Sequence, residues 1–312
     1  MHTIDWLAFK PLPGCTSPHA QMILTQLLRT GKAPPSAGWH VSIGQGDCLC
    51  CEVSTPKSWQ ENGKCIVLVH GLGGSHNSPY MVRMARKLYA KGHKVVRVNL
   101  RGCGSGRLLS KLPYHAGTSF DIEYVLKGLR ELHPTCEITL IGFSLGANIA
   151  LKLAGELESS ASELFQSCIA VTPPVDLVET VRLLATSENR LYHNYFLKRL
   201  REQAEPFTQI RASSLTEFDD TVVAPFWGYK SASHYYEDAS SKRFLSNITI
   251  PVRMLYAMDD PFISMKALDA VSLPGNITVH ATKYGGHMGF LGKAKGHFLY
   301  WLDYQLLRWI EI

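Results

Sequence analysis

The pattern of hydrophobic and polar positions divides the first half of the chain into short apolar runs that alternate with longer amphipathic segments. The short runs are rich in β-branched residues and several are almost continuously apolar, which is typical of strands covered on both faces. The longer segments repeat their apolar positions with a helical period. We predict strands at residues 48–53, 65–70, 94–100, 137–142 and 167–172, and helices at 78–90, 119–132 and 144–157. Such regular alternation predicts a mostly parallel, doubly wound sheet.

The alternation stops between residues 176 and 247, where the pattern is helical or aromatic-rich and predicts no strand. One helix of this stretch is expected to begin near residue 189, with one apolar face formed by Leu191, Tyr195, Phe196 and Leu200. A stretch of this length without strands predicts an insertion that lies over the sheet.

Alternation then returns up to the end of the chain. Strands are predicted at 251–257 and 277–282, with a helix near 266–271 between them and a closing helix from about 297 to 310. We therefore predict an α/β core made of residues 1–175 and 248–312, and a helical cap or lid made of residues 176–247.

Composition and charge narrow the class of protein. The chain has 312 residues, 46% of them hydrophobic and 19% charged, and this excludes a mainly disordered or fibrous protein. The formal net charge of +6 is spread thinly, so no nucleic acid partner is expected. No apolar run reaches the length of a membrane span, and Asp5 and Lys10 interrupt the region where a signal peptide would be apolar. We expect a soluble, cytoplasmic protein, and no pattern indicates its oligomeric state.

The eight cysteines lie mostly in strand-like segments, as buried thiols in a reducing compartment do. Cys48 and Cys51 form a C-x-x-C pair, which raises the question of a metal site. A structural zinc site needs a second pair of ligands, and only Cys65 is near. Ordinary packing within a strand is therefore favoured over metal binding.

The sharpest chemical signal is Gly142-Phe143-Ser144-Leu145-Gly146, between a predicted strand and a predicted helix. A G-x-S-x-G sequence in this context is typical of a nucleophile elbow, because small residues on both sides of the serine relieve the crowding of a tight turn. The turn lifts the hydroxyl group above the sheet and places it at a helix N-terminus, where free N–H groups favour negative charge. We interpret Ser144 as a nucleophile.

A serine nucleophile needs a histidine that accepts its proton and an acid that orients the histidine, in the chain order Ser, acid, His. His287 lies five residues beyond the last predicted strand, in a loop with three glycines. His280 lies inside that strand and His297 at the start of the predicted closing helix, so both fit poorly. His287 is the expected general base.

The acid is expected directly after the predicted strand 251–257, where Asp259 and Asp260 are adjacent. Asp260 is favoured because a proline-directed turn, Asp260-Pro261-Phe262-Ile263, begins there. Asp259 would then be solvent-facing or a turn-capping neighbour, and it stays the alternative.

Two glycine-rich loops follow neighbouring strands. His70-Gly71-Leu72-Gly73-Gly74 is placed to aim backbone N–H groups at the nucleophile, and we expect the N–H groups of Leu72 and Leu145 to form an oxyanion hole. His70 is more typical of a structural loop residue than of a base.

The loop Gly102-Cys103-Gly104-Ser105-Gly106 does not fit a dinucleotide-binding G-x-G-x-x-G sequence and is interpreted as a turn near the mouth of the site.

These motifs together resemble the α/β-hydrolase superfamily, and within it the YheT-like and EMB8-like branch, which is related to the mammalian α/β-hydrolase-domain lipases. The resemblance covers almost the whole chain and implies esterase chemistry with a triad of Ser144, Asp260 and His287. Ala147 stands where a second glycine is common and Met22 where threonine is usual, but neither departure removes a catalytic atom. The further segments that carry the resemblance are Ser17-Pro18-His19-Ala20-Gln21, His70-Gly71-Leu72-Gly73-Gly74-Ser75, Asn99-Leu100-Arg101-Gly102-Cys103, Tyr114-His115-Ala116-Gly117, Glu217-Phe218-Asp219-Asp220, Asp259-Asp260-Pro261-Phe262 and Gly285-Gly286-His287-Met288-Gly289-Phe290.

The prediction for function is a serine hydrolase that cleaves carboxylic esters through an acyl-enzyme on Ser144, with no metal or organic cofactor. The expected partner is a small-molecule or lipid ester with a medium or long acyl chain. The nearest alternatives are an acyltransferase or thioesterase with the same triad, and a non-catalytic binding protein with a hydrolase fold. Aromatic residues of the insertion are expected to supply much of the acyl pocket, namely Tyr192, Tyr195, Phe196, Phe207, Phe226, Trp227, Tyr229, Tyr235 and Tyr236.

Basic residues concentrate in the insertion, which raises the question of weak peripheral contact with an anionic membrane. Glutamates intermingle with them, so a solvated face of mixed charge is favoured instead. The basic residues are Arg182, Arg190, Lys198, Arg199 and Arg201, and the glutamates are Glu179, Glu188, Glu202 and Glu205.

Overall fold

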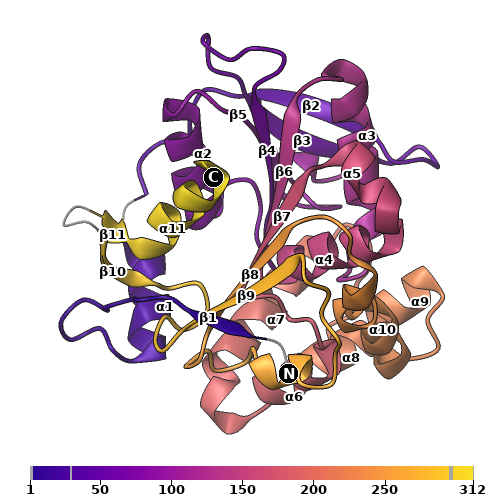
Figure 1. Ribbon diagram of the computed structural model, residues 1–312. Helices are drawn as coiled ribbons and strands as arrows, with labels where there is room; N and C mark the ends of the chain where they lie inside the picture. The colour runs from indigo at the N-terminus through magenta and orange to yellow at the C-terminus, as the bar shows by residue number, and fades with distance from the viewer. Residues whose placement is uncertain (1–2, 29, 295–297, 312) are drawn as a thin grey trace.

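The computed structural model describes residues 3–28, 30–294 and 298–311. Its main sheet has nine strands in the order β1-β9-β8-β7-β6-β4-β5-β3-β2, and β10 and β11 pair separately. Figure 1 shows the sheet crossing the molecule between two groups of helices. The strands are β1 (Ile4–Trp6), β2 (Ala37–Ser42), β3 (Cys48–Ser54), β4 (Lys64–Val69), β5 (Lys94–Val98), β6 (Glu137–Phe143), β7 (Ser167–Val171), β8 (Val252–Ala257), β9 (Ile277–Thr282), β10 (Leu291–Ala294) and β11 (Phe298–Tyr300).

The sheet is mostly parallel, as predicted. The neighbours from β5 through β4, β6, β7, β8 and β9 to β1 all run parallel. Only β3, paired with β5, and β2, paired with β3, run antiparallel. Both cysteines of the C-x-x-C pair, Cys48 and Cys51, lie on β3, and all eight cysteines are free.

Helices cover both faces of the sheet, which explains the nearly continuous apolar strands. Figure 1 places α2 (Pro79–Ala90) and α11 (Trp301–Glu311) on one side, and α3 (Ser119–Leu132), α4 (Leu145–Leu157) and α5 (Ala161–Leu164) on the other. Successive side chains of β4 point to opposite faces. Ile66 and Leu68 pack in the core under α2 and α11, whereas Val67 and Val69 pack in the core under α3 and α4.

The stretch from residue 172 to residue 251 contains helices and no strand. It is continuous with the larger apolar core, because Phe218, Val222 and Tyr235 pack in the same cluster as residues of β4 and α4. Its helical elements are α6 (Leu177–Leu184), η3 (Ser187–Asn189), α7 (Arg190–Ala204), α8 (Leu215–Phe218), η4 (Asp219–Val223, a π-helical turn), α9 (Ala224–Trp227), α10 (Ala232–Ala239), η5 (Ser241–Arg243) and η6 (Leu245–Asn247).

The predicted face of α7 is wrong in part. Leu191 and Tyr195 are 76% and 54% exposed, although both were expected on the apolar face. The helix instead buries Leu197, Leu200 and Ala204, which follow one another at helical spacing and pack on the core. Leu191 and Tyr195 therefore do not lie on the side of α7 that packs on the core.

Several elements differ from the sequence predictions. A short helix, α1 (Pro18–Leu27), and strands β1, β2, β10 and β11 were not predicted. The helix expected near 266–271 is a 3₁₀ turn, η7 (Met265–Leu268). The closing helix begins at Trp301 because β10 and β11 occupy the preceding segment, and its expected start at residue 297 lies outside the described residues. No helix within 3–28, 30–294 and 298–311 is long and apolar enough to cross a membrane.

Candidate active site

Ser144 lies at the junction of β6 and α4, in the turn predicted from the sequence. Its φ of 52° and ψ of −120° belong to a conformation that residues with a side chain rarely adopt. A Cβ atom at Gly142 would come within 2.3 Å of the carbonyl oxygen of Gly146, and one at Gly146 within 2.5 Å of the carbonyl oxygen of Val69. Both glycines are therefore required sterically, and the packing of β6 against α4 holds the strained serine in place.

Ser144, His287 and Asp260 form a single chain of hydrogen bonds. The Oγ atom of Ser144 lies 2.8 Å from Nε2 of His287, and Nδ1 of His287 lies 2.8 Å from Oδ2 of Asp260. The other carboxylate oxygen of Asp260 accepts hydrogen bonds from the backbone N–H groups of Phe262 and Ile263. These bonds orient the carboxylate, which in turn keeps a proton on Nδ1 of the imidazole. Nε2 is then an acceptor that faces the serine hydroxyl group.

Asp259 contacts the histidine loop through the backbone. The N–H group of Gly286 donates to Oδ1 of Asp259 at 2.8 Å. The structure thus places Asp260 next to the imidazole, and it places Asp259 where it holds the segment that carries His287. Burial raises the pKa of the Asp259 carboxyl group above its ordinary value.

The loop with His287 packs against the N-terminal part of the chain. A Cβ atom at Gly286, where φ is 55°, would lie 2.7 Å from the carbonyl oxygen of Pro18. A Cβ atom at Gly289 would lie 2.6 Å from the Cβ atom of Gln21. Gly286 and Gly289 therefore allow the loop to contact α1 closely, in addition to allowing the turn itself.

Gln21 fixes the end of this loop. Its side chain is fully buried, its Nε2 donates to the carbonyl oxygens of Cys15 and Leu291, and its Oε1 accepts from the N–H group of Leu291 at 2.5 Å. Next to it, Thr25 donates to the carbonyl oxygen of Gly289. The N-terminal motif thus acts as a brace behind the histidine loop.

The loop after β4 has one N–H group that meets no acceptor in the described part of the chain. The N–H groups of Gly71 and Gly73 donate to the hydroxyl groups of Tyr80 and Tyr114, each at 2.9 Å. Between them, the N–H group of Leu72 meets no acceptor in the described part of the chain. The N–H group of Leu145 is the first of α4 and has no partner within the helix. Both leucines line the same cavity as Ser144.

His70 is part of the framework of this loop. It is fully buried, with Nδ1 at 2.8 Å from the carbonyl oxygen of Gly71 and Nε2 accepting from the N–H group of Leu100. Burial lowers the pKa of His70 to about 4, so the ring is neutral at pH 7. Its contacts join the ends of β4 and β5 and do not reach the serine.

Helix α7 also contacts the loop after β4. Nε of Arg199 donates to the carbonyl oxygen of Gly73 at 3.2 Å, and Nε2 of Gln203 donates to that of Gly74 at 3.1 Å. The hydroxyl group of Tyr114 donates to Oε1 of Gln203. The insertion therefore helps to set the conformation of the loop that carries Leu72.

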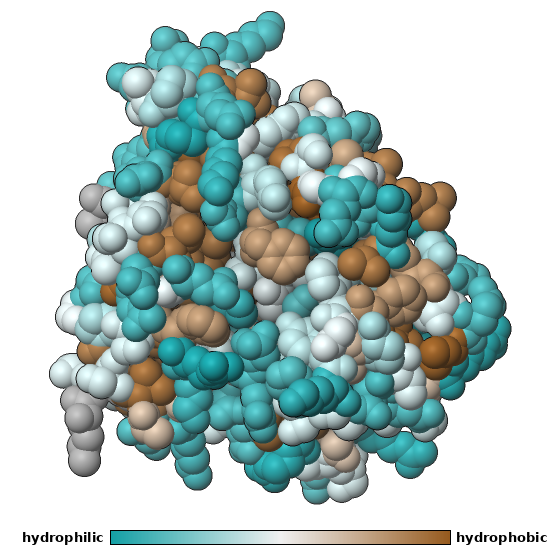
Figure 2. Space-filling model, turned by 90° about the vertical axis from the view of Figure 1, so that its right-hand side faces the viewer, coloured by the Kyte–Doolittle hydropathy of each residue, from teal (hydrophilic) through white to brown (hydrophobic). Residues whose placement is uncertain are grey.

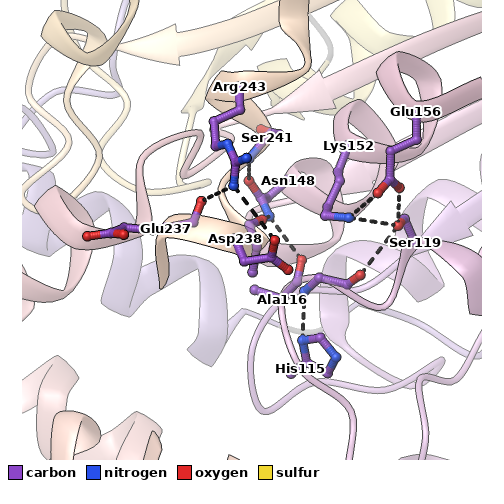
Figure 3. A network of polar contacts seen from close by, with 12 residues as sticks. His115, Ala116, Ser119, Asn148, Lys152, Glu156, Glu237, Asp238, Ser241 and Arg243 are labelled. Carbon is purple, nitrogen blue, oxygen red and sulfur yellow. Dashed lines mark hydrogen bonds and ion pairs between the residues drawn. The ribbon is translucent and has the colours of Figure 1, made fainter. Parts of the chain in front are cut away.

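Asn148 connects α4 to two further segments (Figure 3). Its Nδ2 donates to the carbonyl oxygens of Ala116 and Ala239, and its Oδ1 accepts from the N–H group of Ser241. In the same view, Lys152 and Glu156 reach the hydroxyl group of Ser119. The bonds of Asn148 to Ala239 and Ser241 tie the insertion to α4 one turn after Ser144, whereas the bonds to Ser119 join α4 to α3.

Ser144 lies in the wall of a cavity between the core and the insertion. The cavity encloses about 740 Å³ of atom-free space, counting the part that opens to solvent. Its wall is mostly apolar and is formed by Leu72, Tyr114, His115, Ala116, Ser144, Leu145, Pro174, Leu177, Thr180, Val181, Leu184, Phe196, Leu200, Leu215, Phe218, Asp219, Val223, Tyr235, Tyr236, Phe262 and Ile263.

The aromatic residues expected in the pocket divide into two groups. Phe196, Tyr235 and Tyr236 line the cavity. The others of that set are not in its wall; Tyr195 is exposed, and Trp227 packs against His115 with ring centroids 4.6 Å apart. Phe218 and Phe262 line the cavity although neither was predicted. Sequence shows which residues are aromatic but not which side of a short helix faces inward.

The remaining site features that sequence reasoning missed act through backbone contacts between distant segments. Gln21, Asn148 and Gln203 each bind carbonyl or N–H groups of loops far away in the chain. Gln21 belongs to a segment that carries the family resemblance, which was the available signal. Asn148 and Gln203 carry no such signal, because an isolated amide on a helix is indistinguishable from a solvated one.

The basic residues of the insertion are largely paired. Arg182 binds Glu179 at 2.7 Å and Arg199 binds Glu202 at 3.0 Å, in both cases within one helix. Arg201 donates to the carbonyl oxygen of Ala212. The positive charge of this region is therefore balanced locally.

The sequence matches the family model for the α/β hydrolase fold over residues 64–294. The putative esterase YheT of Escherichia coli strain K12 is 27% identical, over 97% of this chain and 92% of that protein. The monoacylglycerol lipase of Saccharomyces cerevisiae is 27% identical, over 82% of this chain and 61% of its own length. The phospholipase ABHD3 of Mus musculus is 29% identical, over 72% of this chain and 58% of its own length.

Solved structures share the fold at low sequence identity. The Pyrococcus furiosus esterase Pf2001 has a TM-score of 0.60 and 14% identity, over 89% of this chain and 92% of that one. Est1E from Butyrivibrio proteoclasticus, solved with ferulic acid bound, has a TM-score of 0.59 and 16% identity, over 88% and 98%. Both likenesses concern the arrangement of the elements.

Proposed function

The chain belongs to the α/β-hydrolase fold family, and from this premise we propose that it is a serine hydrolase that cleaves carboxylic esters. The observation that carries the proposal is the hydrogen-bonded chain from Ser144 through His287 to Asp260, at 2.8 Å for each link. The relatives named as an esterase, a monoacylglycerol lipase and a phospholipase support ester hydrolysis as the class of reaction.

In the first half of the reaction, Oγ of Ser144 attacks the acyl carbonyl carbon while Nε2 of His287 takes the hydroxyl proton. Asp260 holds the resulting imidazolium through Nδ1–H. The negative charge that develops on the carbonyl oxygen is stabilised by the N–H groups of Leu72 and Leu145. His287 then gives its proton to the departing alkoxide, which leaves as the alcohol. The acyl group stays bound to Oγ of Ser144.

In the second half, His287 removes a proton from a water molecule that attacks the acyl-enzyme. A second tetrahedral intermediate forms against the same N–H groups, and it collapses to the free acid as His287 returns the proton to the departing Oγ of Ser144. At the start of each half, the neutral imidazole of His287 faces the oxygen that attacks, which belongs to Ser144 in the first half and to water in the second. The carboxylate of Asp260 keeps the imidazole in the same tautomer throughout.

We propose residues 176–247 as a cap that shapes the acyl pocket. Their side chains supply most of the apolar residues of the cavity wall, which also contains the core residues Leu72 and Leu145. An acyl chain bound there removes its methylene groups from water, which favours binding by about 0.8 kcal/mol for each fully buried group. The proposed substrate is therefore a small-molecule or lipid ester with a medium or long acyl chain.

A series of p-nitrophenyl esters from acetate to dodecanoate tests this function. We expect kcat/KM to rise beyond butyrate, and we expect hydrolysis to fall by several orders of magnitude in Ser144→Ala. Circular dichroism of the variant controls for folding. A maximum at acetate with no turnover beyond butyrate would overturn the chain-length proposal, and full activity in Ser144→Ala would overturn the mechanism.

A further inference from the structure

One carboxylate in the wall of the cavity has no role in the proposed reaction. Asp219 begins η4, the π-helical turn of the insertion, and lines the same cavity as Ser144. Its neighbours in the wall include the apolar residues Leu215, Phe218 and Val223. Turns of π-helix are rare and frequently occur at functional sites. Asp219 is half-buried, and a carboxylate beside apolar side chains is costly unless hydrogen-bond donors occupy its acceptor positions.

The protein fills only part of the hydrogen-bonding capacity of Asp219. The hydroxyl group of Tyr236 donates to Oδ2 at 2.6 Å, and within the described part of the chain this is the side chain's one hydrogen bond. A carboxylate has about four acceptor positions. Burial raises the pKa of Asp219 to about 7, which reflects how poorly its charge is compensated.

Two other polar side chains of the wall form hydrogen bonds with the backbone. The hydroxyl group of Tyr235 accepts from the N–H group of Ala116, and that of Thr180 donates to the carbonyl oxygen of Asp176. The adjacent Asp220 is exposed, lies outside the wall and accepts from the N–H group of Ala232. Asp219 is the one carboxylate in the described wall of the cavity, and only one of its two oxygens accepts a hydrogen bond from the described part of the chain.

We propose that Asp219, oriented by Tyr236, recognises the substrate by accepting a hydrogen bond from a hydroxyl group of the bound ester. This inference rests on the proposed function and specifies its substrate class as an ester that carries a hydroxyl group. The hydroxyl group belongs either to the alcohol or to the acyl chain. In a mostly apolar pocket, this one carboxylate would orient the substrate and discriminate against esters without the hydroxyl group.

Two matched pairs of esters distinguish these sources. The first pair, 2-hydroxyethyl octanoate and propyl octanoate, differs by a hydroxyl group on the alcohol. The second pair, methyl 8-hydroxyoctanoate and methyl nonanoate, differs by a hydroxyl group on the acyl chain. We expect the wild-type protein to prefer the hydroxylated member of one pair by roughly ten- to a hundredfold in kcat/KM, the range for a hydrogen bond to a charged group.

Three variants test whether the preference for the hydroxylated ester depends on Asp219. Asp219→Asn keeps the shape and removes the charge, and we expect the ratio within the preferred pair to fall to near one. Tyr236→Phe removes the orienting donor, and we expect an intermediate ratio. Asp220→Asn is the matched control on the adjacent carboxylate, and we expect the wild-type ratio there.

The ratio separates recognition from a structural role, because a merely structural Asp219 lowers both members of a pair equally. An unchanged ratio in folded Asp219→Asn, or no wild-type preference in either pair, overturns the inference. If Asp219→Asn does not fold, the wild-type ratios and Tyr236→Phe decide. Failure of the proposed function shows itself separately, as absence of Ser144-dependent hydrolysis of the plain esters, and the inference then falls with it.

Discussion

The backbone at Ser144 has a strained conformation, and the packing of the neighbouring residues stabilises it. Such a conformation costs of the order of 1–3 kcal/mol and persists only where the surrounding structure determines it. Here Gly142 and Gly146 allow β6, α4 and the end of β4 to approach so closely that no Cβ atom fits at either position. The hydroxyl group is thereby fixed before substrate arrives, which is a precondition for attack on a bound carbonyl group.

The two adjacent aspartates give a sharp prediction at the residue scale. Asp260→Asn replaces the acceptor of the imidazole Nδ1–H by an amide, which disfavours the required tautomer, and we expect kcat to fall by about three to four orders of magnitude. Asp259→Asn keeps an oxygen that accepts from Gly286, so we expect a loss of less than about tenfold. Steady-state kinetics on p-nitrophenyl octanoate measure both.

The two substitutions control for local disruption, because they are at adjacent positions and change the charge by the same amount. Thermal unfolding checks that each variant is folded. A larger loss in Asp259→Asn than in Asp260→Asn would assign the acid to Asp259 and contradict the geometry.

At the scale of elements, α7 links the insertion to the proposed oxyanion hole. Gln203 contacts both the carbonyl group of Gly74 and the hydroxyl group of Tyr114, which accepts from the N–H group of Gly73. These bonds hold Gly73 and Gly74, the two residues that follow Leu72 in the loop. The insertion is thus placed to affect the rate of the chemical step as well as the fit of the substrate.

We expect Gln203→Met to lower kcat by about one order of magnitude with little change in KM. Methionine has a similar size but neither donates to Gly74 nor accepts from Tyr114, so the N–H group of Leu72 is less well aimed. Removal of a complete oxyanion donor costs two to three orders of magnitude, which sets the upper limit. Steady-state kinetics on a p-nitrophenyl ester measure the effect.

Lys198→Ala is the control on the same helix, because the side chain of Lys198 is 77% exposed. It should leave kcat and KM at wild-type values. A change in KM alone for Gln203→Met would show that α7 affects binding only, and would contradict its action on the oxyanion loop.

The elements that the sequence predicts well are those whose burial follows from a local pattern. Strands β4, β6 and β9 lie within one residue of their predicted bounds, because mostly apolar runs stand out from their surroundings. Strand β1 and helix α1 have no such pattern. Ile4–Trp6 is largely exposed and becomes a strand only by pairing with β9, which is 271 or more residues away in the chain.

For the whole molecule, the core and the insertion share one apolar cluster, and the cavity with Ser144 lies where they meet. On the face shown in Figure 2, hydrophobic residues are interspersed with hydrophilic ones. The net charge of +6 is accompanied by many ion pairs, including Arg182 with Glu179. Selectivity is therefore expected to come from the cavity rather than from a charged surface.

The candidate site could be predicted where chemistry dictates residue type and order. Ser144 and His287 follow from a strand-turn-helix motif and from the order of elements after it, whereas for the acid the sequence only favoured Asp260 and kept Asp259 as the alternative. The brace at Gln21 and the carboxylate of Asp219 could not be assigned a role, because that role depends on which distant backbone or cavity each side chain meets. Such contacts are set by tertiary packing, and no local pattern encodes them.

The central claim is that Ser144 is the nucleophile, and covalent labelling tests it most directly. The folded protein is treated with a fluorophosphonate, residual esterase activity is followed over time, and the modified peptide is identified by mass spectrometry. We expect a phosphonyl adduct on Ser144, formed in proportion to the loss of activity, and no labelling in Ser144→Ala. An unlabelled Ser144 in fully active protein, or an adduct on another residue that accounts for the inactivation, would contradict the proposed mechanism.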